Sequence, residues 1–230
     1  MATTSRPALQ QRRQAVVTGN RVEVLVKSRD RVKAYGEVFT PADMVERMLD
    51  LVRPELETGP GFVDKTFFEP AAGDGNFLTA IFRRKLAAIE KRYKPSVWPA
   101  ESLFALASIY AVELLEDNHA DAQANMLGEF VAFHTKHDTS CGPRTNLFRA
   151  ANHLIAANIV QGNTLTGLDA AGQPLVFSWW HRVLNVPATV RREAFTFSSL
   201  RRSDDAELLF DFDVLPTYDA CRIDHVHKEA

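Results

Sequence analysis

Several features that would assign this 230-residue sequence to a familiar class are missing. No apolar run approaches the roughly 20 residues that a membrane helix needs. The two cysteines, Cys141 and Cys221, lack CxxC spacing, and no basic segment, apolar run and cleavage site combine at the N-terminus. We therefore expect a cytoplasmic protein with reduced thiols.

A strong charge of one sign is also missing. The formal net charge is −2 and the pI is near 6.4, so no global basic field drives binding to nucleic acid. Any contact with DNA must come from a local patch or from a partner chain. With 46% hydrophobic and 24% charged residues, the chain is long enough to bury one substantial core.

Common catalytic and metal-binding motifs are absent as well. There is no GK[ST] phosphate loop, no GxSxG and no HExxH. The segment HTKHDTSCGP brings His134, His137 and Cys141 together, but this spacing fits no standard zinc pattern and no fourth ligand is evident. We expect no metal site.

What is present is a strand, a glycine turn and a helix. The run KTFFEP at 65–70 is typical of a short strand, and Gly73 and Gly75 follow it. The next segment, 76–93, carries apolar residues at helical spacing on one side and basic residues on the other. Further strands are predicted within 103–112, ending before Glu113, and at 158–163. Strands alternating with helices predict a parallel sheet wrapped by helices.

The flanking regions follow other patterns. Residues 1–35 are polar and Arg-rich, which predicts an arm that begins with a flexible segment. TPAD at 40–43 predicts a helix capped by Thr40, with Pro41 at its first position, that runs to about Val52. Residues 134–157 are expected to form a mixed insertion, and the runs PLVFSWW, AFTFSSL and LLFDFDVL after 164 have β character.

The acidic residues around the glycine turn restrict its ligand. A dinucleotide loop needs a third small residue after GxG, whereas Leu78 stands there. Carboxylates at Glu69 and Asp74 would repel a pyrophosphate but would suit a ligand with an ammonium and a sulfonium group. S-adenosylmethionine is such a ligand, and Glu113 could accept both ribose hydroxyls. An ordinary tight turn stays open as the alternative for this loop alone.

Four segments together resemble the adenine-N6 DNA methyltransferases of restriction-modification systems. They are GEVFTP at 36–41, FEPAAGDGNF at 68–77, IYAVELLEDN at 109–118 and IVQGNTLT at 159–166. They occur in the order of that family, with the FTP segment first, then the glycine loop and then the acidic strand end. The resemblance covers about 36–166.

The resemblance implies a role for each matching residue. Phe39, Thr40 and Pro41 would line the methionine end of S-adenosylmethionine. Its amino acid moiety would be held by Glu69 with the backbone of Pro70, Ala71, Gly73, Asp74 and Gly75. Glu113 would bind the ribose and Leu114 would pack on the adenine. Asn163 stands where the family usually has Asp, and its amide oxygen could still accept from the adenine amine.

The catalytic motif of that family is missing in its usual form. The family uses [DNS]PP[YFW] to accept the amine protons and to stack on a flipped-out base. This sequence contains no PP dipeptide, and its nearest candidate is FDVLPTYD at 212–219, where Pro216 and Tyr218 match. A surface strand and turn is the alternative interpretation of that segment.

The sequence thus predicts an α/β protein with a Rossmann-like methyltransferase three-layer sandwich and a mainly parallel sheet that is incomplete in its C-terminal half. We expect an arm at 1–35, an S-adenosylmethionine-binding core at 36–168 and a β-rich segment at 169–230. The expected function is methylation of DNA at adenine N6, with DNA as partner. One alternative is a non-catalytic cofactor-binding subunit whose partner chain supplies NPPY and target recognition. Another is a methyltransferase of a different substrate, such as a small molecule or a protein.

Overall fold

A small parallel sheet forms the centre of the molecule. The computed structural model describes residues 14–18, 21–198 and 218–228, without the side chains of 14–24. Three strands pair in the order β3 (Phe67–Glu69), β4 (Ile109–Glu113) and β5 (Ile159–Gln161). Both pairings are parallel, with Glu69 opposite Ala111 and Glu113 opposite Gln161. The three carboxyl ends therefore meet at one edge, and the fold is mixed α/β as expected.

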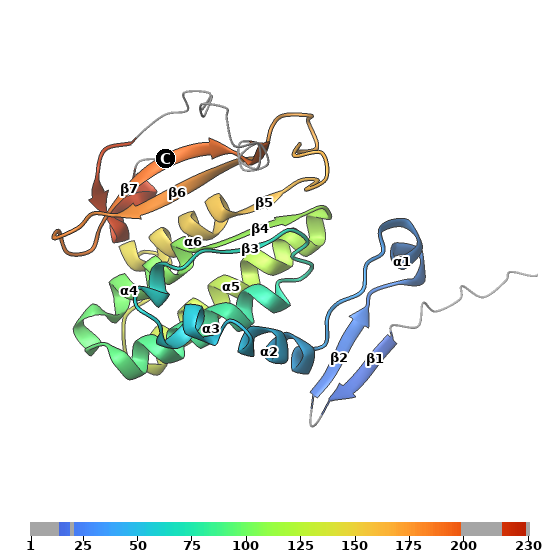
Figure 1. The fold of residues 1–230 in the computed structure, drawn as a ribbon, viewed down its shortest axis with the longest axis horizontal. Helices are drawn as coiled ribbons and strands as arrows, with labels where there is room; N and C mark the ends of the chain where they lie inside the picture. Colours follow the sequence, from blue (N-terminus) through green and yellow to red (C-terminus); the bar gives the residue numbers. More distant parts are fainter. Residues whose placement is uncertain (1–13, 19–20, 199–217, 229–230) are drawn as a thin grey trace, which may run out of the picture.

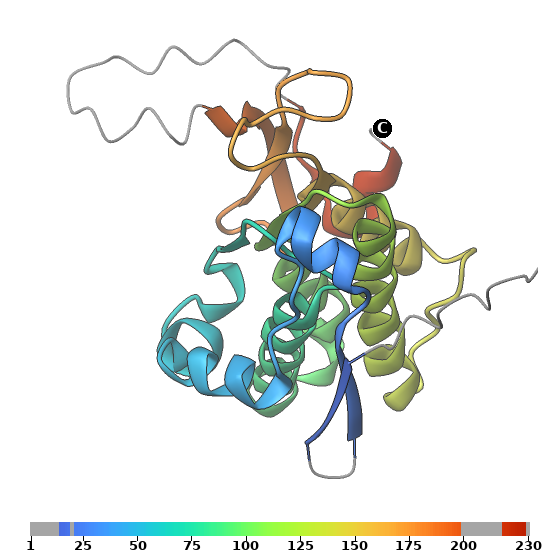
Figure 2. The same cartoon turned by 90° about the vertical axis from the view of Figure 1, so that its right-hand side faces the viewer.

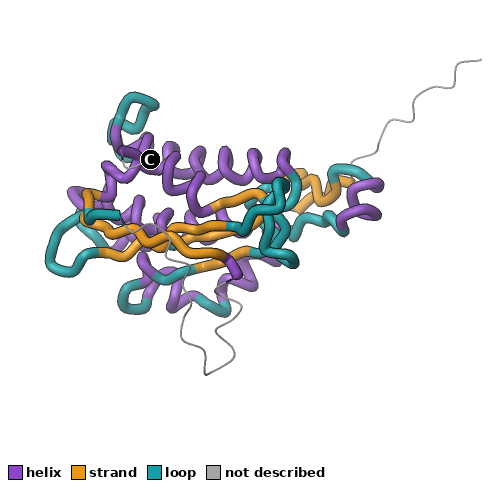
Figure 3. Tube along the Cα trace, turned by 90° about the horizontal axis from the view of Figure 1, so that it is seen from above, coloured by secondary structure: helices purple, strands orange, loops and turns teal. Residues whose placement is uncertain are grey.

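Helices lie on either side of this sheet (Figures 1 and 3). They are α3 (Asn76–Arg92), α4 (Trp98–Ala107), α5 (Glu116–Lys136) and α6 (Asn146–Asn158). Every residue of β4 is buried, which explains why its sequence is continuously apolar before Glu113. Within the described part of the chain, no helix is both long enough and apolar enough to cross a membrane.

The C-terminal strands build a separate antiparallel sheet instead of extending the parallel one. β6 (Val176–Arg182), β7 (Thr189–Thr196) and β8 (Cys221–Arg222) pair in that order, and a 3-10 helix spans Ile223–Lys228. The Tyr110 hydroxyl donates to Ser178 O (2.9 Å), and Trp180 Nε1 donates to Asn158 Oδ1 (2.9 Å). These buried hydrogen bonds fix β6 against the core. The predicted run LLFDFDVL lies outside the described residues.

The N-terminal arm is an antiparallel hairpin of β1 (Gln14–Thr18) and β2 (Arg21–Val26), followed by α1 (Arg29–Tyr35). The hairpin projects from the helical body, whereas α1 lies in front of that body in the same view (Figure 2). Helix α2 (Ala42–Asp50) comes next, followed by short turns of π-helix at Pro54–Thr58 and of 3-10 helix at Phe62–Asp64 and Pro95–Val97.

The structure adds helices to two predicted segments and corrects the start of a third. The insertion at 134–157 contains α6, which Thr145 caps by accepting from Phe148 N (3.2 Å). Helix α2 starts one residue later than expected and ends at Asp50, with Pro41 as its N-cap and no side-chain cap at Thr40. The arm also contains a helix, α1, none of whose residues is buried. Ser28 caps its N-terminus, and Gly36 ends it in a left-handed conformation.

Lys85 is a buried cation in α3. Its Nζ donates to Val63 O (3.0 Å), Lys65 O (2.7 Å) and Ser108 Oγ (2.6 Å), and the side chain is fully buried. These three acceptors match the three protons of an ammonium group. Burial nevertheless lowers the pKa of Lys85 from 10.5 to about 7, while Asp64 acts in the opposite sense.

We expect the folded protein to become more stable as the pH rises from about 7 towards 10.5. In this window the unfolded chain keeps a proton on Lys85 that the folded chain has released, so the free energy of unfolding increases with pH. Between pH 7 and 9.5, the free energy of unfolding measured in urea should rise by about 3 kcal/mol more in the wild type than in a Lys85→Met variant. Lys91→Met, at an exposed position of the same helix, should behave as wild type. Equal pH dependence in all three proteins would contradict this.

Candidate functional site

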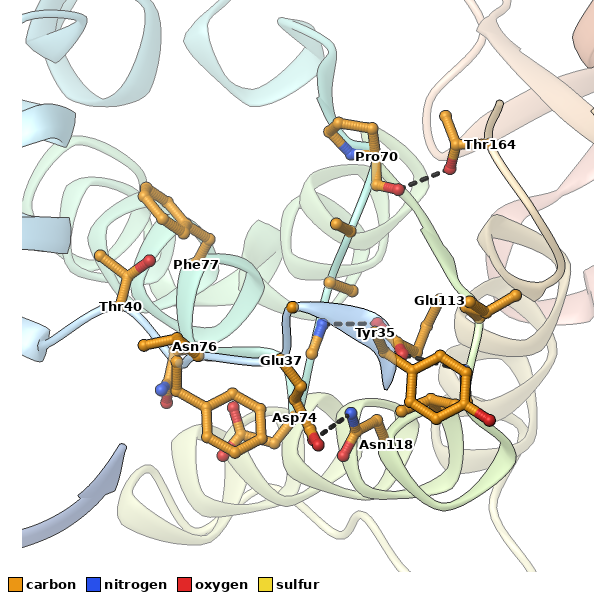
Figure 4. A pocket seen from close by; sticks show the side chains of 18 of the residues that line it. Tyr35, Glu37, Thr40, Pro70, Asp74, Asn76, Phe77, Glu113, Asn118 and Thr164 are labelled. Carbon is orange, nitrogen blue, oxygen red and sulfur yellow. Dashed lines mark hydrogen bonds between the residues drawn. The ribbon is translucent and has the colours of Figure 1, made fainter. Parts of the chain in front are cut away.

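A pocket of about 360 Å³ opens at the carboxyl edge of the parallel sheet (Figure 4). Its wall consists of four stretches of chain, at 35–40, 70–77, 113–118 and 162–165. The last three directly follow or include the ends of β3, β4 and β5. This edge is where α/β proteins generally bind ligands, because the loops after parallel strands converge there.

The glycine loop forms one side of the pocket. Gly73 and Gly75 have φ of 57° and 89°, conformations that residues with side chains rarely adopt. A Cβ on Gly73 would lie 3.0 Å from the ring of Phe39, and a Cβ on Gly75 would lie 3.0 Å from the Cα of Ala122. The loop needs glycine at both positions because the backbone turns sharply and packs closely.

Glu113 joins the loop to the end of β4. Its side chain is buried, its Oε2 accepts from Gly73 N (2.7 Å) and its Oε1 accepts from Leu115 N (2.9 Å). Ala72 N also donates to Val112 O (3.0 Å), which holds the loop along the strand. Each carboxylate oxygen has a second lone pair, so Glu113 can still accept from ligand hydroxyls.

The two carboxylates that flank the glycines have different surroundings. Glu69 Oε1 accepts from Ala71 N (3.1 Å), and Glu69 does not line the pocket. Asp74 lines it, and its Oδ1 is buried with no hydrogen-bond partner in the part of the chain that the structure describes. Burial raises the pKa of both carboxyls above their usual values.

Asn163 holds its own turn together. Its Oδ1 accepts from Leu165 N (2.9 Å) and from Thr166 N (3.4 Å), in an Asx-type turn. The oxygen that we expected to accept from an adenine amine is therefore already engaged. The neighbouring Thr164 donates its hydroxyl to Pro70 O, which connects this turn to the glycine loop (Figure 4).

The pocket brings together most of the cofactor residues predicted from the sequence. The lining includes Phe39, Thr40, Pro70, Ala71, Gly73, Asp74, Glu113, Leu114 and Asn163. Pro41, Glu69 and Gly75 are adjacent to it in the chain and do not line it.

The predicted catalytic pair does not lie at the pocket as far as the structure describes it. Pro216 lies outside the described residues. The amide of Tyr218 donates to Arg192 O (3.2 Å), and the Arg192 guanidinium lies 4.3 Å from the centre of its ring. Tyr218 thus packs on β7 and is not among the pocket residues.

The end of the predicted arm also contributes to the pocket. Tyr35, the last residue of that arm, lines the pocket together with Gly36, Glu37 and Val38, which we placed in the core. Asn118, at the start of α5, also lines it.

Charged side chains hold the arm to α5. Lys27 Nζ donates to Asp117 (3.2 Å), Asn118 (2.6 Å) and Asp121 (2.9 Å). Arg31 donates to both oxygens of Asp117, at 2.7 and 3.0 Å. The sequence contained a sign of this contact. Lys27 and Arg31 are four residues apart in the arm, and their acidic partners Asp117 and Asp121 are four residues apart in α5.

Arg31 also pairs with Glu37 in the pocket wall. Nε and Nη2 of Arg31 donate to the two carboxylate oxygens of Glu37. Asn118 Nδ2 also donates to Glu37 Oε1 (2.9 Å; Figure 4). The Glu37 side chain is 6% exposed, so its charge depends on these partners. Hydrogen bonds to Asp117 and Glu37 raise the pKa of Arg31, and those from Arg31 hold the pKa of Asp117 far below its usual value.

We expect Arg31→Met to loosen the arm without unfolding the core. Glu37 would lose its charged partner while buried, and α1 has no buried residues to hold it. Amide hydrogen exchange at 32–39 should accelerate by about tenfold or more, with the helices of the core unchanged. Arg29→Met, at an exposed position of the same helix, is the matched control. Unchanged exchange in Arg31→Met would show that Arg31 is not needed to hold the arm.

The histidine-rich segment is structural where the structure describes it. His134 is buried and its Nε2 lies 3.0 Å from Ser102 Oγ. Burial lowers the pKa of His134 to about 4. No group of three or more His, Cys, Asp or Glu side chains among the described residues could hold a metal ion.

Comparison with known proteins gives no assignment. No protein-family model matches the chain, and no curated protein or solved structure matches it either. The interpretation of the pocket therefore depends on its own geometry and chemistry.

Proposed function

We propose that this pocket binds S-adenosylmethionine and that the chain is the cofactor-binding core of a Rossmann-like methyltransferase. One observation carries the proposal. The four segments that resemble adenine-N6 DNA methyltransferases are separated by long stretches of sequence, and each contributes residues to the wall of one pocket.

The chemistry of the lining fits this cofactor. The charged residues that line the pocket are Glu37, Asp74 and Glu113, and no Lys, Arg or His is among them. Such a lining disfavours phosphate groups and favours a ligand with cationic groups. Within the described residues, Oδ1 of Asp74 also remains an unused acceptor.

In this proposal, different segments of the pocket bind different parts of the cofactor. Glu113 accepts the two ribose hydroxyls, Leu114 packs on the adenine, and the backbone from Ala71 to Gly75 holds the amino acid moiety. The cofactor supplies an activated methyl group on its sulfonium sulfur. Tyr35, at the end of the arm, lines the pocket beside these groups.

The proposed substrate is DNA adenine, methylated at N6. This part of the proposal rests on the resemblance, since the site where a base would be held includes Pro216, which lies outside the described residues. The packing of Tyr218 against Arg192 favours the second candidate, a cofactor-binding subunit that completes its base pocket with a partner chain.

Calorimetric titration of the purified chain with S-adenosylmethionine tests the cofactor site. We expect one site with micromolar affinity. Absence of binding at millimolar cofactor would refute the proposal. Transfer of labelled methyl groups to duplex DNA, with and without candidate partner chains, then separates an enzyme from a subunit. Tyr218→Ala should abolish transfer and spare cofactor binding only if the chain is active through that residue.

A further inference from the structure

Asn163 lies where the glycine loop and the ends of β4 and β5 meet. It follows the end of β5 closely, and the preceding Gly162 N donates to Glu113 O (2.9 Å), which ties this turn to the end of β4. On the other side, Thr164 donates its hydroxyl to Pro70 O of the glycine loop. Asn163 itself lines the pocket. It is therefore a neighbour of Glu113, which accepts the ribose hydroxyls in the proposed function.

The acceptor atoms of Asn163 are all used within its own turn. Oδ1 accepts from Leu165 N (2.9 Å) and from Thr166 N (3.4 Å). The backbone oxygen accepts from Gly167 N (2.8 Å) and from Thr166 Oγ1 (3.3 Å). A carbonyl oxygen has two lone pairs, so neither oxygen has one left for a ligand. The two backbone donors also fix the orientation of the side-chain amide, because its oxygen must face them.

The side-chain nitrogen of Asn163 is not used in this way. The backbone N–H donates to Leu168 O (2.9 Å), whereas Nδ2 has no hydrogen-bond partner among the described residues. Nδ2 is also not one of the buried atoms that lack a partner, so it is accessible. An amide nitrogen can only donate. At this end of the pocket, Asn163 therefore offers a donor and no acceptor.

We infer that Asn163 selects the purine of the cofactor by donating from Nδ2 to N1 of adenine, and not by accepting from the exocyclic amine. The inference rests on the proposed function and deepens it. The amine is itself a donor, so it cannot pair with Nδ2. N1 is bonded to the carbon that carries the amine, and it has a free lone pair. Guanine and hypoxanthine carry a proton on N1, so the same residue would exclude purines of that kind.

The resemblance to adenine-N6 DNA methyltransferases implies the opposite polarity at this position. An aspartate here would have a second carboxylate oxygen in the place of Nδ2 and could accept from the adenine amine. Asn and Asp both form this type of turn through Oδ1. Exchange of Asn163 for Asp thus replaces one donor by one acceptor and keeps the turn. The two interpretations predict opposite changes in the affinity for adenosine.

The test measures the binding of adenosine and of 1-deazaadenosine, in which CH replaces N1, by calorimetric competition with S-adenosylmethionine. Both nucleosides are neutral, so the charge added in Asn163→Asp does not attract them. The wild type should bind adenosine about tenfold more tightly than 1-deazaadenosine, as expected for one hydrogen bond. Asn163→Asp should weaken adenosine by about tenfold or more and should bind the two nucleosides equally. Asn152→Asp, at an exposed position of α6 outside the lining, should behave as wild type.

Three results would overturn the inference while S-adenosylmethionine still binds. The wild type might not distinguish the two nucleosides, adenosine might not compete with the cofactor, or Asn163→Asp might bind adenosine at least as tightly as the wild type does. The first two results need no variant, so the inference can fail even if Asn163→Asp does not fold. Failure of S-adenosylmethionine to bind the wild type would overturn the proposed function together with this inference.

Discussion

The Gly73→Leu variant is expected to lose S-adenosylmethionine binding by at least about 100-fold while the protein stays folded. Gly73 has φ of 57°, and its Cβ position lies 3.0 Å from Cδ1 and Cε1 of Phe39. Phe39 is only 7% exposed, so its ring cannot move aside easily. A leucine would both strain the loop and fill space beside the pocket.

Calorimetry measures this loss, and thermal unfolding followed by circular dichroism checks the fold. Gly128→Leu is the control, because Gly128 lies on an exposed part of α5 with nothing within 4 Å of its Cβ position. This control should bind as wild type. Wild-type affinity in Gly73→Leu would show that the glycine loop does not hold the cofactor.

The Glu113→Ala variant should also lose about 100-fold or more in affinity, since hydrogen bonds to a charged group contribute roughly 1.5–3 kcal/mol each. The variant would also leave the amides of Gly73 and Leu115 without their acceptor. Loss of affinity alone therefore does not show whether Glu113 contacts the ribose or only supports the glycine loop.

Adenosine and 2′-deoxyadenosine separate these two effects. The wild type should bind adenosine more tightly, because deoxyadenosine lacks one hydroxyl donor. In Glu113→Ala this difference should vanish, as it does when both partners of one interaction are removed. Glu116→Ala is the control for the loss of a nearby carboxylate. If Glu113→Ala still preferred adenosine to deoxyadenosine as strongly as the wild type does, Glu113 would not bind the ribose.

The parallel sheet could be predicted from the sequence because its signals are local. The strand at 67–69, the glycines and the helix from Asn76 follow one another directly, and each has its own periodicity or turn residue. The buried strand before Glu113 is continuously apolar. Given parallel pairing, the strand ends had to meet at one edge, so Glu69, Glu113 and Asn163 were expected near each other.

Other features depend on contacts that no local pattern reveals. Helix α6 is an exception, because it was not predicted although Ala150, Ala151, Leu154 and Ile155 recur at helical spacing on its buried face. The position of Tyr218 follows from its pairing with β7, a strand more than twenty residues earlier. The use of Asn163 Oδ1 within its own turn depends on backbone geometry.

The sequence by itself determined the strand, the glycine turn and the helix, because periodicity and turn chemistry act over a few residues. It also determined the order of the strands along the chain and the acidic residues at their ends. Only the tertiary structure decided that the arm is held against α5 beside the pocket, since Lys27 and Arg31 meet Asp117 across about ninety residues of chain. It also decided which buried carboxylate oxygen has no hydrogen-bond partner among the described residues. Glu37 and Glu113 accept hydrogen bonds from distant segments, whereas Asp74 Oδ1 has no partner among the described residues. Hydrogen bonding of this kind depends on which groups the whole fold brings together.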